Sequence, residues 1–123
     1  MGPPRLVPIP TQDVLQRIVI HGDGEVLVEW AEKIGKALRG KVHLAHVRRI
    51  YGTLKRLELG AFDDAAKREM LLLRPRLAYT VKRQSSATGL AQVLEPALRI
   101  VSGPAHLRNL IDFFEAILAY HRE

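Results

Sequence analysis

Residues 43–59 of the chain have the sequence HLAHVRRIYGTLKRLEL and are followed by Gly60. On a helical wheel of about 100° per residue, the apolar side chains of this stretch fall within one arc. They are Leu44, Val47, Ile50, Tyr51, Leu54 and Leu57. The other side of the wheel carries four cations, Arg48, Arg49, Lys55 and Arg56. The stretch therefore predicts an amphipathic helix that ends at the glycine, with one face in a core and the opposite face positively charged.

The same helical spacing of apolar residues recurs in four further segments, each bounded by a capping residue, glycine or proline. Caps included, the expected helices span about residues 23–39, 43–59, 63–84, 90–102 and 105–121. Residues 13–20 are compatible with a short helix, capped by Thr11 or Asp13, or with a strand, because β-branched residues cluster at its end. The prediction is an all-α fold, a single-domain helical bundle of about five helices.

Two prolines lie inside these expected helices. A proline has no backbone N–H and its ring crowds the preceding turn, so Pro75 removes the hydrogen bond to the carbonyl of Leu71. We therefore expect a kink or a break at Pro75. Pro96 should interrupt its helix unless it lies in the first turn.

Chain length and composition narrow the class of protein. A chain of 123 residues fits one domain and should bury about two thirds of its unfolded surface. The absence of cysteine excludes disulfides and thiolate zinc sites, and suits a reducing cytoplasm. The apolar runs are far shorter than the roughly 20 residues that span a bilayer, so no membrane helix is expected. Four prolines among the first ten residues favour an extended arm over residues 1–12, ahead of a helical-bundle domain at 13–123.

The positive charge is concentrated in one region of the chain. From Lys41 to Arg83 there are eleven Lys and Arg against four Asp and Glu, a net charge of +7. The other eighty residues carry eight against nine, a net charge of −1. Clustered Arg and Lys most often neutralise phosphates and release counterions. Nucleic acid is therefore the first candidate partner.

Six of these cations are the candidate nucleic-acid-binding residues, namely Arg48, Arg49, Lys55, Arg56, Arg76 and Arg83. The first four form two parallel rows along one helix, because the members of each row are seven residues apart and no acid is interleaved before Glu58. The last two have the same spacing on the next helix. All six form one surface only if the two helices pack side by side. A merely solvated helix face is the alternative, although such a face normally mixes charges of both signs.

Neither a cofactor, a metal ion nor a catalytic site is expected. His43 and His46 have a spacing that could place two metal ligands on one helix face, but no third ligand stands beside them and their surroundings are basic. Asp63 and Asp64 point about 100° apart on a helix and suit the start of a helix better than a metal pair. The glycines form neither a phosphate-binding loop nor a dinucleotide fingerprint.

The aromatic residues are expected mainly in the core. Tyr51 and Tyr79 could stack on nucleic-acid bases, but their apolar neighbours on the wheel favour core packing with the hydroxyl group at the rim. Trp30 lies on the apolar face of its helix and is also expected in the core.

Three segments carry a family resemblance. They are VRRIY at 47–51 followed by LKRL at 54–57, then LRPRLAY at 73–79 with Arg83 behind it, and finally FEAILAYH at 114–121. In this order and spacing, they make the chain from about Val26 to Tyr120 resemble the small subunit of the type III-A CRISPR interference complex, the Csm small-subunit family.

The resemblance implies a non-enzymatic helical protein. Several copies would stack along the complex, beside the backbone subunits that hold the guide RNA, and the basic face would line the channel of guide and target RNA. Cleavage and cyclic oligoadenylate synthesis would belong to other subunits. Recognition should be through phosphate and ribose, because pairing with the guide already selects the sequence.

Two other functions remain open from the sequence. An independent helical DNA-binding domain, such as a helix-turn-helix regulator, would insert one basic helix into a major groove and prefer duplex DNA. The region around Gly60 lacks a compact two-helix unit with base-contacting Asn or Gln at the start of its second helix. An architectural adaptor would instead present its basic face to an acidic protein and would bind neither nucleic acid.

Overall fold

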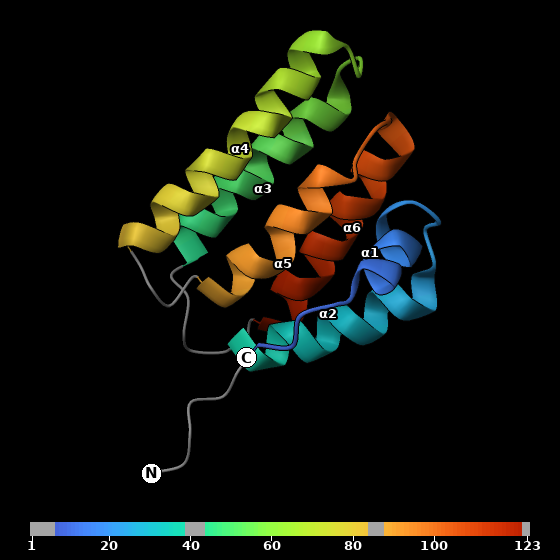
Figure 1. The fold of residues 1–123 in the computed structure, drawn as a ribbon, viewed down its shortest axis with the longest axis vertical. Coiled ribbons are helices and arrows are strands. Elements are labelled where there is room, and N and C mark those ends of the chain that lie inside the picture. Colours follow the sequence, from blue (N-terminus) through green and yellow to red (C-terminus); the bar gives the residue numbers. More distant parts are fainter. Residues whose placement is uncertain (1–6, 39–43, 84–87, 122–123) are drawn as a thin grey trace.

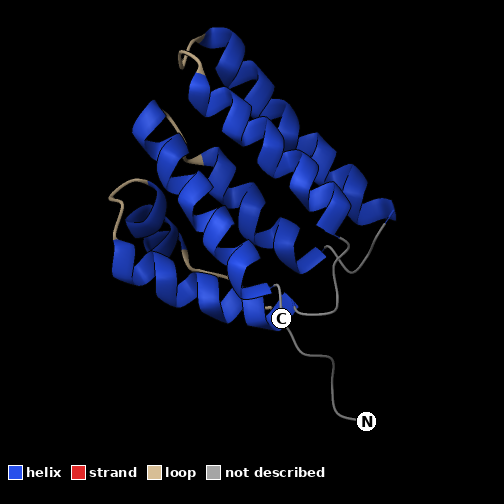
Figure 2. Cartoon of the chain, turned by 180° about the vertical axis from the view of Figure 1, so that it is seen from behind, coloured by secondary structure: helices blue, strands red, loops and turns tan. Residues whose placement is uncertain are grey.

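The computed structural model describes residues 7–38, 44–83 and 88–121, and helices account for most of them (Figure 1). In chain order, these are α1 (Gln12–Val19), α2 (Gly24–Leu38), α3 (Leu44–Leu59), α4 (Asp64–Arg83), α5 (Thr88–Arg99) and α6 (Pro104–His121). Figure 2 shows no strand in the described ranges. The predicted all-α bundle is confirmed, with six helices instead of about five.

The additional helix is α1, the segment for which the sequence also allowed a strand. Its N-cap is Thr11, whose hydroxyl oxygen accepts a hydrogen bond from the backbone N–H of Val14 at 3.3 Å. The side chains that it buries are Leu15, Ile18 and Val19. Most helical stability in proteins comes from packing an apolar face, so this burial outweighs the strand preference of the β-branched residues.

Aspartate caps begin two of the longer helices where the sequence predicts them. The Asp23 carboxylate accepts a hydrogen bond from the backbone N–H of Val26 at 3.3 Å, directly before α2. The Asp63 carboxylate accepts one from the backbone N–H of Ala66 at 2.9 Å, directly before α4. Asp63 is therefore a helix cap, as the sequence favoured.

Both internal prolines are accommodated within continuous helices. Pro75 lies inside α4, which is not broken there, and Pro96 lies inside α5 well beyond its first turn. The expected interruption at Pro96 is therefore wrong. The carbonyls that lose a partner belong to Leu71 and Gln92, and both residues are exposed. Water can bond such carbonyls, while the apolar faces on both sides of each proline remain buried.

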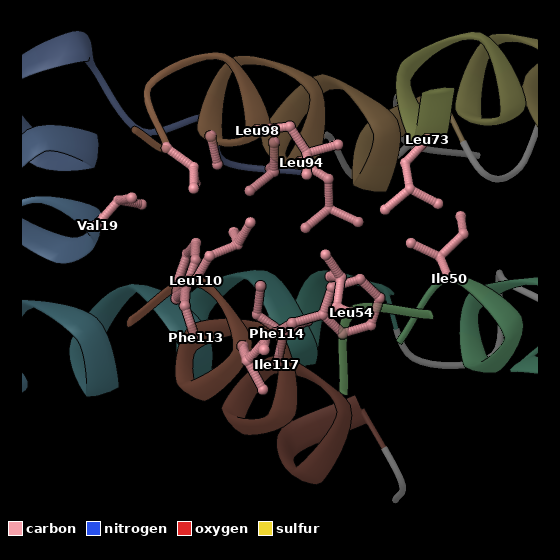
Figure 3. Close-up of a cluster of buried hydrophobic side chains, with 14 of the residues drawn as sticks. Val19, Ile50, Leu54, Leu73, Leu94, Leu98, Leu110, Phe113, Phe114 and Ile117 are labelled. Atoms are coloured by element: carbon pink, nitrogen blue, oxygen red, sulfur yellow. The ribbon is translucent and has the colours of Figure 1, made fainter. Parts of the chain in front are cut away.

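One apolar core joins all six helices. Helix α6 packs against α1, α2 and α3, and α4 packs against α3 and α5. Figures 1 and 2 show α3 and α4 side by side and antiparallel, on the far side of α5 and α6 from α2. Figure 3 shows Leu94 and Leu98 of α5 gathered with Phe113, Phe114 and Ile117 of α6. The pair α3 and α4 therefore forms one outer side of the bundle.

The apolar face predicted for α3 packs on the core wherever its side chains are described, with Tyr51 partly buried. Ile50, Leu54 and Leu57 are all core residues. Leu44 and Val47 lie outside the described side chains. Trp30 of α2 is half-buried against the core, close to its expected position.

The described part of the N-terminal arm lies against the bundle. Residues 1–6 lie outside the described residues, whereas Val7 packs on the core and Pro10 is buried. A Cβ atom at Gly89 would lie 2.4 Å from Cγ2 of Val7. Glycine in the first turn of α5 therefore allows the arm to pass close to the helix.

Candidate nucleic-acid interface

The two rows of cations on α3 face different neighbouring helices. Arg48 lines a hollow on the α6 side together with Glu115 and Leu118. Arg49 lines a groove on the α4 side together with Arg76. Because members of a row are seven residues apart, Lys55 follows Arg48 and Arg56 follows Arg49. The six candidate cations are thus divided between two flanks of α3, which we call the α6 flank and the α4 flank.

The α6 flank already contains carboxylates. The hydroxyl of Tyr51 donates a hydrogen bond to Glu115 at 3.0 Å, and burial together with this bond raises the pKa of Tyr51. Burial also raises the pKa of Asp112, with further contributions from the charges of Glu115 and Glu58. Such a concentration of negative charge weakens the attraction of this flank for a polyanion.

The α4 flank carries a groove of about 360 Å³. We call it the α3–α4 groove, and its lining residues are Arg49, Ile50, Pro75, Arg76, Tyr79 and Thr80. A smaller adjoining hollow shares Arg49, Ile50 and Arg76 and adds Thr53 and Leu73. Two arginines from different helices therefore border the same space.

Arg49 and Arg76 are exposed and form no ion pair with any other residue that the structure describes. Two threonines lie beside them in the groove and its adjoining hollow. The hydroxyl of Thr53 donates to the carbonyl of Arg49 at 3.1 Å, and that of Thr80 donates to the carbonyl of Arg76 at 2.9 Å. These bonds leave the hydroxyl oxygens as acceptors, while no described residue takes up a donor of either guanidinium group.

Arg83 contacts Tyr79, one of the residues that line the groove. The Arg83 guanidinium donates a hydrogen bond to the Tyr79 hydroxyl at 3.0 Å and lies 5.7 Å from the centre of its ring. Tyr79 is 59% exposed, so its expected place in the core is wrong. Tyr51 does pack as expected, with its ring 5.8 Å from that of Phe114 and its hydroxyl at the rim.

Three other cations of α3 and α4 are engaged by carboxylates. Arg56 pairs with Glu69 of α4, and Lys55 lies 3.7 Å from Glu58. Arg74 points to the α5 side, where Glu95 accepts hydrogen bonds from it at 2.8 Å and from Arg99 at 2.7 Å. The hydrogen bond from Arg99, and then that from Arg74, lower the pKa of Glu95 despite its partial burial.

Neither a cluster of metal ligands nor a membrane-spanning helix occurs within the described ranges. The described residues contain no group of three or more His, Asp or Glu side chains that could hold a metal ion. His43, one half of the histidine pair considered above, lies outside the described residues. None of the helices within the described ranges is long and apolar enough to cross a membrane.

Comparison with protein families gives a match over most of the chain. The model of the family described as Csm2 Type III-A matches residues 21–123. The chain belongs to the Csm2 Type III-A family. It is therefore a small structural subunit of a type III-A CRISPR effector complex, which has other subunits. The chain matches no curated protein and no solved structure in the corresponding comparisons.

The Csm2 Type III-A match includes every candidate cation. It begins at His21, so α1 and the N-terminal arm lie ahead of it, and it covers α2 to α6. The resemblance that the sequence predicted from about Val26 to Tyr120 is confirmed. The groove between α3 and α4 therefore lies within the part of the chain that defines the family.

Proposed function

We propose that this chain is the non-catalytic RNA-binding small subunit of its type III-A CRISPR ribonucleoprotein complex, acting in antiviral defence. It contacts the backbone of the guide and target RNA through the α4 flank of α3. Arg49, Arg76 and Arg83 make the principal contacts. Arg48, Lys55 and Arg56 contribute through the general positive field of the region rather than through direct contact.

The observation that carries this proposal is the convergence of Arg49 and Arg76 on the α3–α4 groove. Neither is paired with a described carboxylate, whereas Arg56 and Arg74 are. Arginine presents a planar fork of donors that matches two phosphate oxygens at once. Two such forks from adjacent helices can hold consecutive positions of an RNA backbone.

Recognition of the RNA backbone suits a complex in which a guide RNA selects the target sequence. Pairing between guide and target selects the sequence, so a protein subunit needs only the shape and charge of the RNA. A-form RNA presents its phosphates and 2′-hydroxyl groups on accessible surfaces, whereas its deep major groove excludes side chains. Further copies of this chain, stacked along the complex, would extend the contact along the RNA.

The test compares two double variants of equal net charge. Binding of the full chain to a short single-stranded RNA of mixed sequence is measured by fluorescence anisotropy over a range of salt concentrations. R49Q/R76Q should bind more weakly at low salt, and its log-affinity against log-salt slope should shrink by about 0.7 per lost phosphate contact. K33Q/K36Q removes two exposed lysines of α2, on the far side of the bundle, and should leave the slope close to that of the unmodified chain.

Other outcomes point to other functions. Equal losses in both double variants would contradict a localised interface. Tighter binding to duplex DNA than to RNA would favour the independent DNA-binding domain, and no binding to either would favour the adaptor for an acidic protein. Cleavage of RNA by the purified chain would contradict its non-catalytic role.

A further inference from the structure

The α3–α4 groove has an apolar floor that contacts with phosphate do not require. Ile50 lies at its base and is only 6% exposed, and Pro75 forms part of its wall. Figure 3 shows Ile50 of α3 and Leu73 of α4 pointing toward one another. A phosphate group gains nothing from such a surface, whereas the flat face of a base or the carbon edge of a ribose buries apolar area against it.

Tyr79 supplies an aromatic surface beside this floor. Tyr51 on the other flank is packed on Phe114, but Tyr79 keeps more than half of its surface in solvent. The hydrogen bond from Arg83 anchors the Tyr79 hydroxyl from one turn further along α4. A ring that is exposed yet held at its tip is preorganised to stack, because less side-chain freedom is lost when a ligand binds.

Resting on the RNA-binding function proposed above, we propose that the α3–α4 groove binds one unpaired nucleotide of RNA. Its base stacks on Tyr79 above the apolar floor, and its phosphate lies between Arg49 and Arg76. The volume of about 360 Å³ is at the small end of the range for ligand pockets and suits a single nucleotide. A base inside a duplex has both faces covered by its neighbours, so only an unstacked base can enter.

The test separates stacking from backbone contact. Affinities are measured for a short single-stranded RNA and for the same sequence fully paired in a duplex, using the full chain. Y79A should lose about 5- to 150-fold in affinity for the single strand, the range for one stacked base. Its affinity for the duplex should stay unchanged. Y79F keeps the ring but loses the hydrogen bond from Arg83, so it should retain most of the affinity for the single strand and lose much less than Y79A.

L72A is the matched control, since Leu72 is an exposed apolar residue of α4 that lies seven positions before Tyr79 and outside the groove lining. It should leave both affinities unchanged, and a loss like that of Y79A would overturn the assignment to the groove.

An equal loss on both RNAs in Y79A, or a loss in Y79F as large as in Y79A, would overturn the stacking of a base. If Y79A binds the single strand normally while R49Q/R76Q does not, the nucleotide pocket is wrong and the RNA-binding function stands. If the unmodified chain binds neither RNA, both proposals fail.

Discussion

At the scale of single residues, two arginines of the same row differ in whether a carboxylate pairs with them. Arg49 and Arg56 face α4 from equivalent positions two helical turns apart. Arg49 meets Arg76 across the groove, whereas Arg56 meets Glu69. A guanidinium that is already paired must give up its partner before it contacts phosphate, which reduces its contribution to binding.

Replacing Glu69 should therefore strengthen RNA binding. E69Q removes the partner of Arg56 and makes this guanidinium available to phosphate, so the log-affinity against log-salt slope for single-stranded RNA should steepen by about 0.7. The cost in stability should remain below about 1 kcal/mol, because the lost ion pair lies at the surface. Fluorescence anisotropy measures the first quantity and urea denaturation the second.

The matched control for this prediction is E32Q. It removes an equal charge from α2 and releases Lys36, which lies 2.7 Å from Glu32, on the far side of the bundle. Its salt slope should not change. An identical gain in both variants would show that only net charge matters and would contradict a role for the α4 flank.

At the scale of helices, the close contact between α2 and α6 depends on a glycine, which has no side chain. A Cβ atom at Gly35 would lie 2.6 Å from Cβ of Tyr120 and 2.7 Å from the carbonyl oxygen of Ile117. Backbone and Cβ atoms cannot rotate away as the end of a side chain can. A Cβ atom at Gly52 in α3 would have no atom within 4 Å apart from its chain neighbours and the backbone of its own helix. The first glycine allows two helices to approach closely, and the second has no packing role.

Alanine at these two glycines should have opposite effects. In G35A the overpacking penalty of about 1–3 kcal/mol exceeds the gain in helix propensity of about 1 kcal/mol, so the free energy of unfolding should fall. G52A should gain about 0.5–1 kcal/mol, because alanine loses less backbone entropy in a helix. Urea denaturation measures both. A stabilising G35A would contradict the close approach of α2 to α6 at Gly35.

At the scale of the whole molecule, the shared core predicts that the six helices unfold together. Buried residues of every helix belong to one cluster, and Phe114 joins α6 to α3 through its contact with Tyr51. Small single domains with one core generally unfold in a single transition. That the chain is one helical domain preceded by an arm stays a prediction until this is measured.

Two optical probes should report the same unfolding curve. Far-UV circular dichroism follows all helices, while the fluorescence of Trp30, the single tryptophan, reports on α2. F114A should shift both curves equally and cost about 3–5 kcal/mol, because it leaves a cavity at a residue only 1% exposed. L59A, at a residue 87% exposed, should change stability by less than about 0.5 kcal/mol. Separate transitions would show that α3 and α4 form an independent unit.

Local patterns in the sequence were sufficient to predict the helices, the cationic face and the family. Apolar spacing located α2 to α6 within a few residues, and Asp23 and Asp63 cap where their positions predict. These features depend on neighbours within one or two turns, which the sequence states directly. The concentration of charge between Lys41 and Arg83 is likewise a property of the sequence alone.

Only the tertiary structure decided what each helix face meets. A helical wheel gives the direction of a side chain relative to its own helix. The neighbouring helices decide whether that side chain is buried in the core, pairs with a carboxylate or faces solvent. The apolar residues of α4 are spread over more than one side of the helix, with Leu71, Leu72 and Tyr79 exposed while Leu73 and Leu77 are buried, so its wheel could not show that Tyr79 faces outward. The division of the cations between two flanks of α3 has the same origin, because Glu69 and Arg76 approach α3 from α4 and Glu115 approaches it from α6.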